Sequence, residues 1–124
     1  MSNKPFVFIV DSFSNYKLNE GLQALGLTCE DGYHTTGAGG ADMILDVPRW
    51  LNSKNLLVFM SSFHGSVEPA VELSKKIKAA NPNARIIFRS STEHSPDSVF
   101  ERAMKKDHRY DETLKIVAEF LAEK

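Results

Sequence analysis

The sequence predicts a three-layer α/β domain built on a parallel sheet, and three features support this. Two fully apolar runs, over residues 6–10 and 56–60, each end in a polar turn, which is typical of parallel strands buried on both faces. Segments with helical spacing of apolar residues follow both runs, and strand and helix patterns alternate along the chain. The length of 124 residues suits one domain with its own core, so we expect residues 1–124 to form a single domain.

Composition and charge narrow the classes of function. The chain is 42% hydrophobic and 25% charged, as in ordinary globular proteins. The formal net charge of -1 offers no basic excess for direct contact with nucleic acid. A single cysteine, Cys29, cannot form an internal disulfide, and the first apolar run is too short for a signal peptide or membrane span. We therefore expect a cytoplasmic protein without membrane attachment.

Strands and helices are predicted in alternation from the apolar spacing and the turn residues. The strands are expected over residues 6–10, within 27–33, and over 56–60 and 85–89. The helices are expected around Leu18, Leu22 and Leu25, and over residues 41–51, 67–80, 95–104 and 111–122. The second strand is the weakest, because Asp31-Gly32 suits a turn equally well.

Capping signals place the helix ends. Gly26 is expected to stop the first helix, and Ser66 to begin the one over 67–80. Pro48 indicates a kink or a later start in the helix over 41–51. Ser95-Pro96-Asp97 combines a serine cap, a proline at the first helical position and an acid in the first turn. It predicts a fourth helix, whose apolar positions are Val99, Phe100, Ala103 and Met104.

The number of strands depends on the segment before the last helix. Residues 105–110 are all polar or charged apart from the Tyr110 ring, and they contain no apolar run that would mark a buried strand. We therefore expect four parallel strands with helices on both faces, and the sequence leaves open a fifth strand near 105–110.

Polar side chains follow the predicted strands where each strand ends. In open α/β sheets, ligands bind at the carboxyl ends of the strands. The candidates for a ligand or metal pocket there are Asp11, Ser12, Ser61, Ser62, His64, Ser90 and Ser91. Hydroxyls beside one carboxylate suit a small ligand or an anion, although the same residue types also cap helices and close turns. Asp11 is equally compatible with a polar strand terminus.

A catalytic role for these residues has little support. Ser62, His64 and Asp11 include the residue types of a hydrolytic triad. However, Ser62 and His64 are two residues apart in a turn, and nothing in the sequence supplies an oxyanion hole. A non-enzymatic role is therefore the favoured expectation.

The order of elements resembles the receiver domain of two-component signalling, the CheY-like member of the flavodoxin-like folds. Residues 6–11 resemble the receiver's first strand with its acidic end, and residues 56–62 resemble the strand that ends at the phosphoacceptor aspartate. Residues 72–82 with 86–91 resemble its third helix and fourth strand, which ends in a switch Ser/Thr, here Ser90-Ser91. The resemblance covers nearly the whole chain.

The departures from the receiver pattern predict a degenerate site. A receiver has two acids after its first strand, where this chain has Asp11-Ser12, and Ser62 stands at the phosphoacceptor position. The Lys-Pro that ends a receiver's fifth strand is missing, and Lys105 or Lys106 is expected to replace it only if the loop folds back. The resemblance thus implies no cofactor, with at most weak binding of Mg²⁺ through Asp11, because Mg²⁺ prefers carboxylate ligands. It also implies no aspartyl-phosphate chemistry, which needs a carboxylate nucleophile.

A Toprim domain is similar in part, as a weaker alternative. Asp11, Asn15 and Ser61-Ser62-Phe63 occupy positions where that family keeps its acids, and the turn at Thr35-Thr36-Gly37 is also similar. The acids are again replaced, so Toprim metal chemistry is not expected.

Three functions follow as hypotheses. The first is a pseudo-receiver that transmits signals or binds another protein, through its last helix, without phosphorylation. The second is a small-ligand-binding protein or enzyme with a site at the strand ends. The third is a degenerate Toprim-like domain. The sequence does not indicate an oligomeric state.

Overall fold

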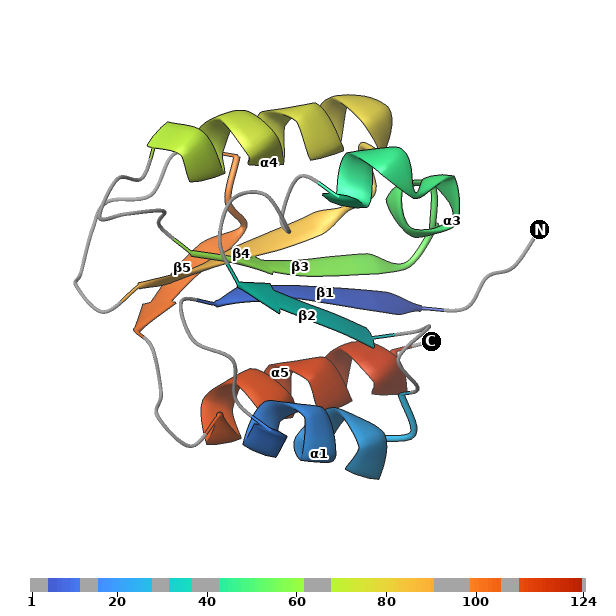
Figure 1. Cartoon of the computed structure of the whole chain (residues 1–124), viewed down its shortest axis with the longest axis vertical. Coiled ribbons are helices and arrows are strands. Elements are labelled where there is room, and N and C mark those ends of the chain that lie inside the picture. Colours follow the sequence, from blue (N-terminus) through green and yellow to red (C-terminus); the bar gives the residue numbers. More distant parts are fainter. Residues whose placement is uncertain are drawn as a thin grey trace.

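A five-stranded, fully parallel sheet forms the centre of the molecule (Figure 1). The computed structural model describes residues 5–11, 16–27, 32–36, 43–61, 68–90, 99–105 and 110–123. The strands are β1 (Phe6–Asp11), β2 (Gly32–Thr36), β3 (Leu56–Met60), β4 (Arg85–Ser90) and β5 (Arg102–Lys105). Their order in the sheet is β2-β1-β3-β4-β5, the flavodoxin-like arrangement. The predicted three-layer α/β fold is confirmed.

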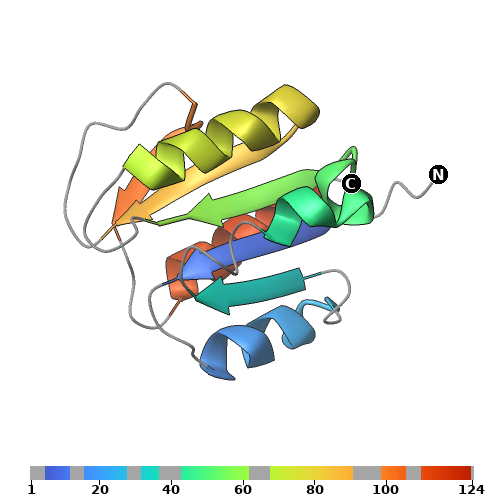
Figure 2. The same ribbon diagram turned by 45° about the horizontal axis from the view of Figure 1, so that its top comes forward.

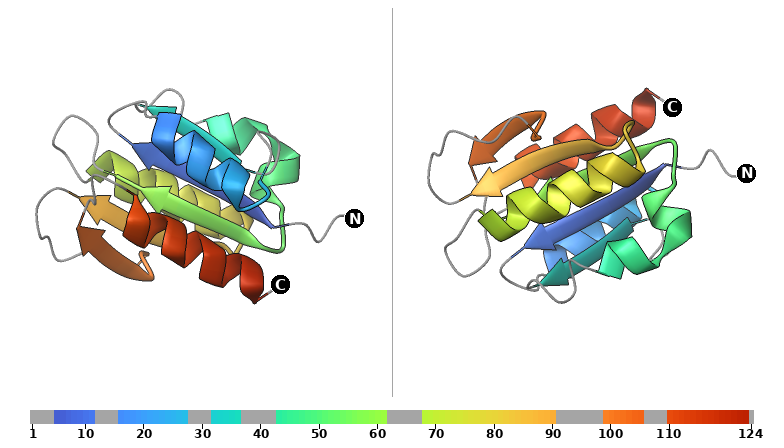
Figure 3. Two further views of the ribbon diagram at one scale, coloured as in Figure 1. Left: turned by 90° about the horizontal axis from the view of Figure 1, so that it is seen from below. Right: turned by 90° about the horizontal axis from the view of Figure 1, so that it is seen from above.

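Helices cover both faces of the sheet, as Figures 1 and 3 show. One face carries α1 (Tyr16–Ala24) and α5 (Asp111–Ala122). The other carries the 3-10 helix η1 (Met43–Asp46), α3 (Pro48–Leu51) and α4 (Glu68–Ala80). Among the described residues, no helix is both long and apolar enough to cross a membrane.

The two faces of the central strands bury two separate cores. Successive side chains of a strand point to opposite faces, so Phe8 and Val10 pack in a cluster with Trp50, whereas Val7 and Ile9 pack in one that includes residues of α5. Every residue of β3 is fully buried, and this explains its uninterrupted apolar sequence.

Two local signals act as predicted. Gly26 has φ +88°, and the amides of Gly26 and Leu27 donate to the carbonyls of Gln23 and Leu22. This is the Schellman arrangement, in which a glycine in the left-handed region ends the helix. Pro48 is the first residue of α3, where its missing N–H costs no helical hydrogen bond.

Some predicted boundaries need correction. The helix expected over residues 41–51 consists of two short pieces, η1 and α3, because Pro48 begins a new helix rather than bending an existing one. The second strand lies at Gly32–Thr36, later than the expected 27–33, and it pairs in parallel with β1, so Gly32 is a strand residue. The last helix, α5, has the predicted bounds.

The predicted fourth helix is wrong over its second half, where the chain forms β5. Arg102 and Ala103 are exposed, and β5 pairs with β4 alone. An edge strand with little apolar burial has no apolar run to reveal it, and Ala, Met and Lys favour helices in isolation. Phe100 does enter the core, where its ring lies 4.9 Å from that of Phe88. The fifth strand therefore exists, and it ends at Lys105, the first residue of the segment 105–110.

Several predicted features lie outside the described residues. They are Cys29, the glycine-rich residues 37–40, the cap Ser66 and the start signal Ser95-Pro96-Asp97.

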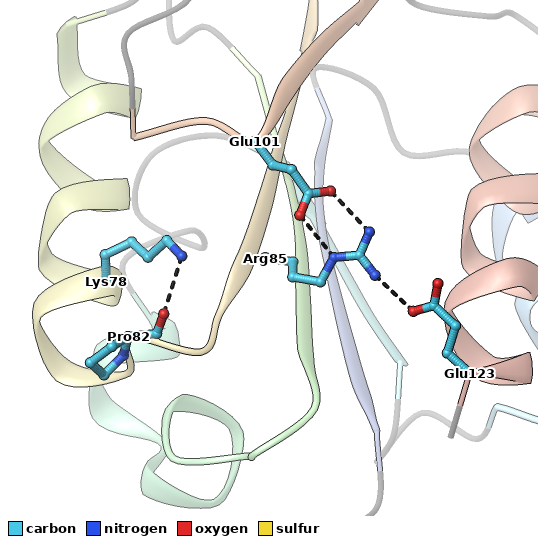
Figure 4. A network of polar contacts seen from close by, with 5 residues as sticks. All are labelled: Lys78, Pro82, Arg85, Glu101 and Glu123. Atoms are coloured by element: carbon cyan, nitrogen blue, oxygen red, sulfur yellow. Dashed lines mark hydrogen bonds and ion pairs between the residues drawn. The ribbon is translucent and has the colours of Figure 1, made fainter.

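Two polar networks secure the amino-terminal end of the sheet. The Asn81 side chain, after α4, donates to the carbonyls of Leu51 and Ser53 at 2.9 and 2.6 Å. Nearby, Arg85 at the start of β4 makes a bidentate contact with Glu101, 2.9 Å for each bond, and reaches Glu123 near the end of α5 at 3.1 Å (Figure 4). Arg85 thus connects β4 with the residue before β5, Glu101, and with the end of α5.

Candidate functional site at the carboxyl edge of the sheet

The carboxyl ends of the five strands meet at one edge of the sheet, because all neighbouring strands are parallel (Figure 2). Asp11 is the last residue of β1, and Ser61 directly follows β3. Since β1 pairs with β3, these two strand ends are neighbours, as the sequence predicted. Ser90 is the last residue of β4, so three of the predicted site residues share this edge.

The other predicted site residues, Ser12, Ser62, His64 and Ser91, lie outside the described residues. The idea of a triad from Ser62, His64 and Asp11 therefore stays a prediction. Ser61 is 2% exposed, which places it at the buried end of β3 rather than in an open turn.

Lys105 is a strand-end residue that the sequence analysis misplaced. It is the last residue of β5 and stands in register with Ser90 of β4. The expectation that a lysine reaches this edge only through a folded-back loop is therefore wrong, because Lys105 belongs to the sheet itself. Receivers carry a lysine at the end of their fifth strand, so this feature of the resemblance is kept. The sequence did not reveal this position of Lys105, because the residues of β5 have the composition of a helix.

Arg89 is the second cation at this edge, and the sequence analysis treated it only as the end of a strand. It lies one residue before the end of β4 and is 1% exposed, the largest of the fully buried side chains. Its Cζ lies 5.3 Å from the centroid of the Tyr110 ring. An arginine is almost never buried without compensating contacts, so a charged residue directly after the apolar run Ile86-Ile87-Phe88 was the available signal.

Tyr110 brings the start of α5 to the same edge. It is the N-cap residue of α5 and has φ +60°, a left-handed conformation that is strained for a bulky side chain. The residue is 5% exposed, and its ring contacts Arg89. Strained residues of this kind persist where surrounding contacts hold them, and they are concentrated at functional sites.

The charges at this edge are separated across the sheet. Asp11 ends β1, whereas Arg89 and Lys105 belong to β4 and β5. Strand β3 lies between β1 and β4, so at ~4.8 Å per strand the backbones of β1 and β4 are about 10 Å apart. In sequence, the described part of the edge therefore has an acidic residue at the end of β1 and basic residues at or near the ends of β4 and β5.

The described strand ends offer a single carboxylate, Asp11, for a receiver-type Mg²⁺ site. Mg²⁺ is held by carboxylates, carbonyls and waters in octahedral geometry, and Asp11 is the only acid among the described strand ends. Within the described part of the chain, no three His, Cys, Asp or Glu residues are grouped so as to hold a metal ion.

Comparison with solved structures shows that the fold is that of response-regulator receiver domains. The response regulator TrrA from Thermotoga maritima, solved in complex with Mg²⁺ and BeF, is 20% identical with a TM-score of 0.62, and the match covers 94% of this chain and 99% of that one. A CheY-like receiver domain from Methanospirillum hungatei is 18% identical with a TM-score of 0.59, covering 96% of this chain and 94% of that one.

The signal receiver domain of a LuxO repressor protein from Vibrio parahaemolyticus has the same TM-score of 0.59 at 16% identity, covering 97% of this chain and 92% of that one. No protein-family model and no curated protein matches the sequence. The chain is thus receiver-like in fold, as the first resemblance predicted, and nothing in these matches tests the Toprim alternative.

Proposed function

We propose that this chain is a pseudo-receiver, a signalling or protein-interaction module that works without aspartyl phosphorylation. One observation carries the proposal: β3 ends at Met60 and continues into Ser61-Ser62, hydroxyls where a receiver has its phosphoacceptor aspartate. A serine hydroxyl without an adjacent base is a poor nucleophile for a phosphoryl group.

Intact-protein mass spectrometry after incubation with acetyl phosphate and Mg²⁺ tests this proposal. The mass is expected to stay unchanged, whereas an intact receiver treated in parallel gains one phosphoryl group. Because Lys105 ends β5 as in receivers, the missing acids are the feature under test. An adduct of one phosphoryl group on this chain would refute the proposal.

The proposed partner surface is the outward face of α5. Its exposed charged residues are Asp111, Glu112, Lys115 and Glu119, and Glu123 follows directly after the helix, so the face is mainly acidic. A face of this charge favours a basic surface on a protein partner. The receiver-like fold supports a protein partner, and the acidity of this face favours one with a basic surface.

Charge reversal on two helices tests this surface. Glu119→Lys is expected to weaken crosslinking to partners in cells, because it reverses one exposed charge of α5. Glu68→Lys, at an exposed position of α4 on the other face of the sheet, is the matched control and is expected to leave crosslinking unchanged. Equal loss in both variants, or loss in neither, would contradict a role for α5.

Binding of a small ligand at the strand ends is the second candidate function. It is favoured by the shared position of Asp11, Ser61 and Ser90 at the carboxyl edge of the sheet. Asp11→Asn is expected to alter ligand binding while leaving stability near that of the wild type. A change in stability alone would count against a ligand site that includes Asp11.

A further inference from the structure

We infer that the partner of the acidic face of α5 is a second copy of this chain, which docks on that face through a basic surface of its own. This basic surface is formed by α3, the turn after it and the second half of α4. The choice of partner rests on the proposed role of α5 in protein binding. Copies of the chain are then expected to associate head to tail, each offering one surface of either charge.

The basic surface lies where the end of α4 meets the segment after α3. Its basic residues are Arg49, Lys54, Lys75, Lys76 and Lys78, all exposed except the half-buried Lys78. Two hydrogen bonds from the Asn81 side chain, at 2.9 and 2.6 Å, fasten the end of α4 to the chain between Arg49 and Lys54. The described exposed acids on this side of the sheet are Asp46 in η1 and Glu68 and Glu72 in the first half of α4. The second half of α4 therefore has cations only.

The acidic face of α5 has the complementary charge, and part of it is already engaged within the chain. Glu112 lies 3.8 Å from Arg102, and Glu123 accepts a hydrogen bond from Arg85 at 3.1 Å. Glu119 lies between these two acids in the sequence and is exposed. We therefore expect Glu119 to be the centre of the contact with the basic surface of the other copy.

The two surfaces point in opposite directions, because α4 and α5 cover opposite faces of the sheet (Figures 1 and 3). A copy therefore cannot place its own basic surface against its own α5, and two different neighbours can occupy the two surfaces at once. A contact between unlike surfaces is heterologous, and it continues as an open chain unless its rotation closes a ring.

Both surfaces also carry small apolar side chains beside their charges. Ala79 and Ala80 are exposed at the end of α4, and Ala122 is exposed at the end of α5, where Leu121 is half-buried. Protein interfaces combine an apolar centre with a polar rim, and complementary charges set the orientation of the partners. The chain thus supplies both halves of one contact.

Sedimentation velocity of the purified chain over a series of protein concentrations tests the inference. In low salt, the sedimentation coefficient is expected to rise with protein concentration. In high salt it is expected to stay at the value of the monomer, because salt screens attraction between exposed charges. A monomer at every concentration in low salt would overturn the inference, and so would association of equal strength in both salts.

Charge reversals on the two surfaces identify the residues responsible. Lys76→Glu and Glu119→Lys are each expected to weaken self-association about tenfold, because each replaces weak attractions between exposed charges by repulsions. Glu68→Lys, in the first turn of α4, is the matched control and is expected to associate at least as well as the wild type. All three positions are exposed, so the fold is expected to tolerate the changes.

A mixture of Lys76→Glu with Glu119→Lys tests the head-to-tail arrangement. The first variant keeps its acidic face and the second keeps its basic surface, so mixing is expected to restore the association that each lacks alone. A contact between two α5 faces would not recover in this way. Absence of recovery, or association like that of the wild type in either variant alone, would overturn the inference.

Failure of this inference is distinguishable from failure of the proposed function. If the purified chain stays monomeric while Glu119→Lys still loses crosslinks in cells, α5 binds a different protein and only the choice of partner is wrong. A phosphoryl adduct would instead refute the proposed function, whatever the state of association.

Discussion

The guanidinium of Arg89 lies over the ring of Tyr110, with 5.3 Å between Cζ and the ring centroid, and both residues are almost fully buried. The contact joins the end of β4 to the first residue before α5, so the position of a buried cation and the start of the proposed partner helix depend on each other. The backbone of Tyr110 is in the left-handed region where the residue makes this contact, at φ +60°.

A double-mutant cycle on this pair is expected to show a favourable coupling of about 1–2 kcal/mol, the range for a desolvated cation–π contact. The variants are Arg89→Met, Tyr110→Asn and their combination, since asparagine tolerates the left-handed conformation without supplying a ring. Tyr110→Phe, which keeps the ring, separates the contribution of the hydroxyl. Urea unfolding measures the free energies, and a coupling near zero would show that the ring contact does not hold the pair together.

Mg²⁺ alone is expected to leave the amides of Asp11, Ser61 and Ser90 unshifted at millimolar concentration, and beryllofluoride with Mg²⁺ is expected to do the same. The physical reason is the lack of a second acid at the described strand ends. Backbone NMR gives the measurement, with the intact receiver TrrA as positive control. Grouped shifts at these residues would instead indicate a working metal site.

Gly21→Ala is expected to lower the free energy of unfolding by about 1–3 kcal/mol through overpacking. A Cβ at Gly21 would overlap Cδ1 of Leu114 and lie 3.0 Å from its Cδ2, because α1 packs closely against α5. Elsewhere in a helix the same change is stabilising by about 0.5–1 kcal/mol. Thermal unfolding of Gly21→Ala is compared with that of the double variant Gly21→Ala/Leu114→Ala to check the cause. If the overlap is responsible, Gly21→Ala should lower stability less when Leu114 is shortened to alanine.

Asn81→Ala is expected to cost about 2–4 kcal/mol, because it removes two donors and leaves the carbonyls of Leu51 and Ser53 without this partner. Asn81 is 7% exposed, so water replaces the lost bonds poorly. The exposed neighbour Asn83 supplies the control, since Asn83→Ala keeps both bonds. Fluorescence of the single tryptophan, Trp50, reports unfolding of this region, and similar midpoints for the two variants would contradict the role of Asn81.

The ion pairs of Arg85 predict a small loss of stability in acid. Hydrogen bonding from Arg85 lowers the pKa of Glu101 below its ordinary value of 4.5. A carboxyl with a lowered folded-state pKa contributes stability above the unfolded pKa, and that stability disappears as the pH falls through the folded value. The contribution is expected to stay under about 1 kcal/mol, since both side chains are partly exposed, at 35% and 40%.

Urea unfolding of the wild type and Glu101→Gln over a pH series measures this effect. The difference between them is expected to be constant above the ordinary glutamate pKa, and to shrink below it. It should also shrink in high salt, which screens exposed charges. A difference that is unchanged across the series would assign the effect of the substitution to something other than the charge of Glu101.

The central strands and the last helix were predictable because their signals are local. An apolar run such as Leu56–Met60 has no stable position except between two covered faces, and the spacing along Asp111–Ala122 suits only a helix with one buried side. Gly26 and Pro48 act through their own backbone preferences, so their effects on helix ends were also visible in the sequence.

The tertiary structure alone decided that residues 102–105 form a strand and that Lys105 stands at its carboxyl end. Arg-Ala-Met-Lys has helical propensity, and it is a strand only because β4 offers a free edge whose backbone groups pair with it. That pairing brings Lys105 level with Ser90, and the buried Arg89 contacts the ring of Tyr110, 21 residues further along the chain. The sequence by itself determined which residues were polar at the strand ends. The hydrogen-bonded register between strands, which depends on contacts distant in the chain, determined which of them meet.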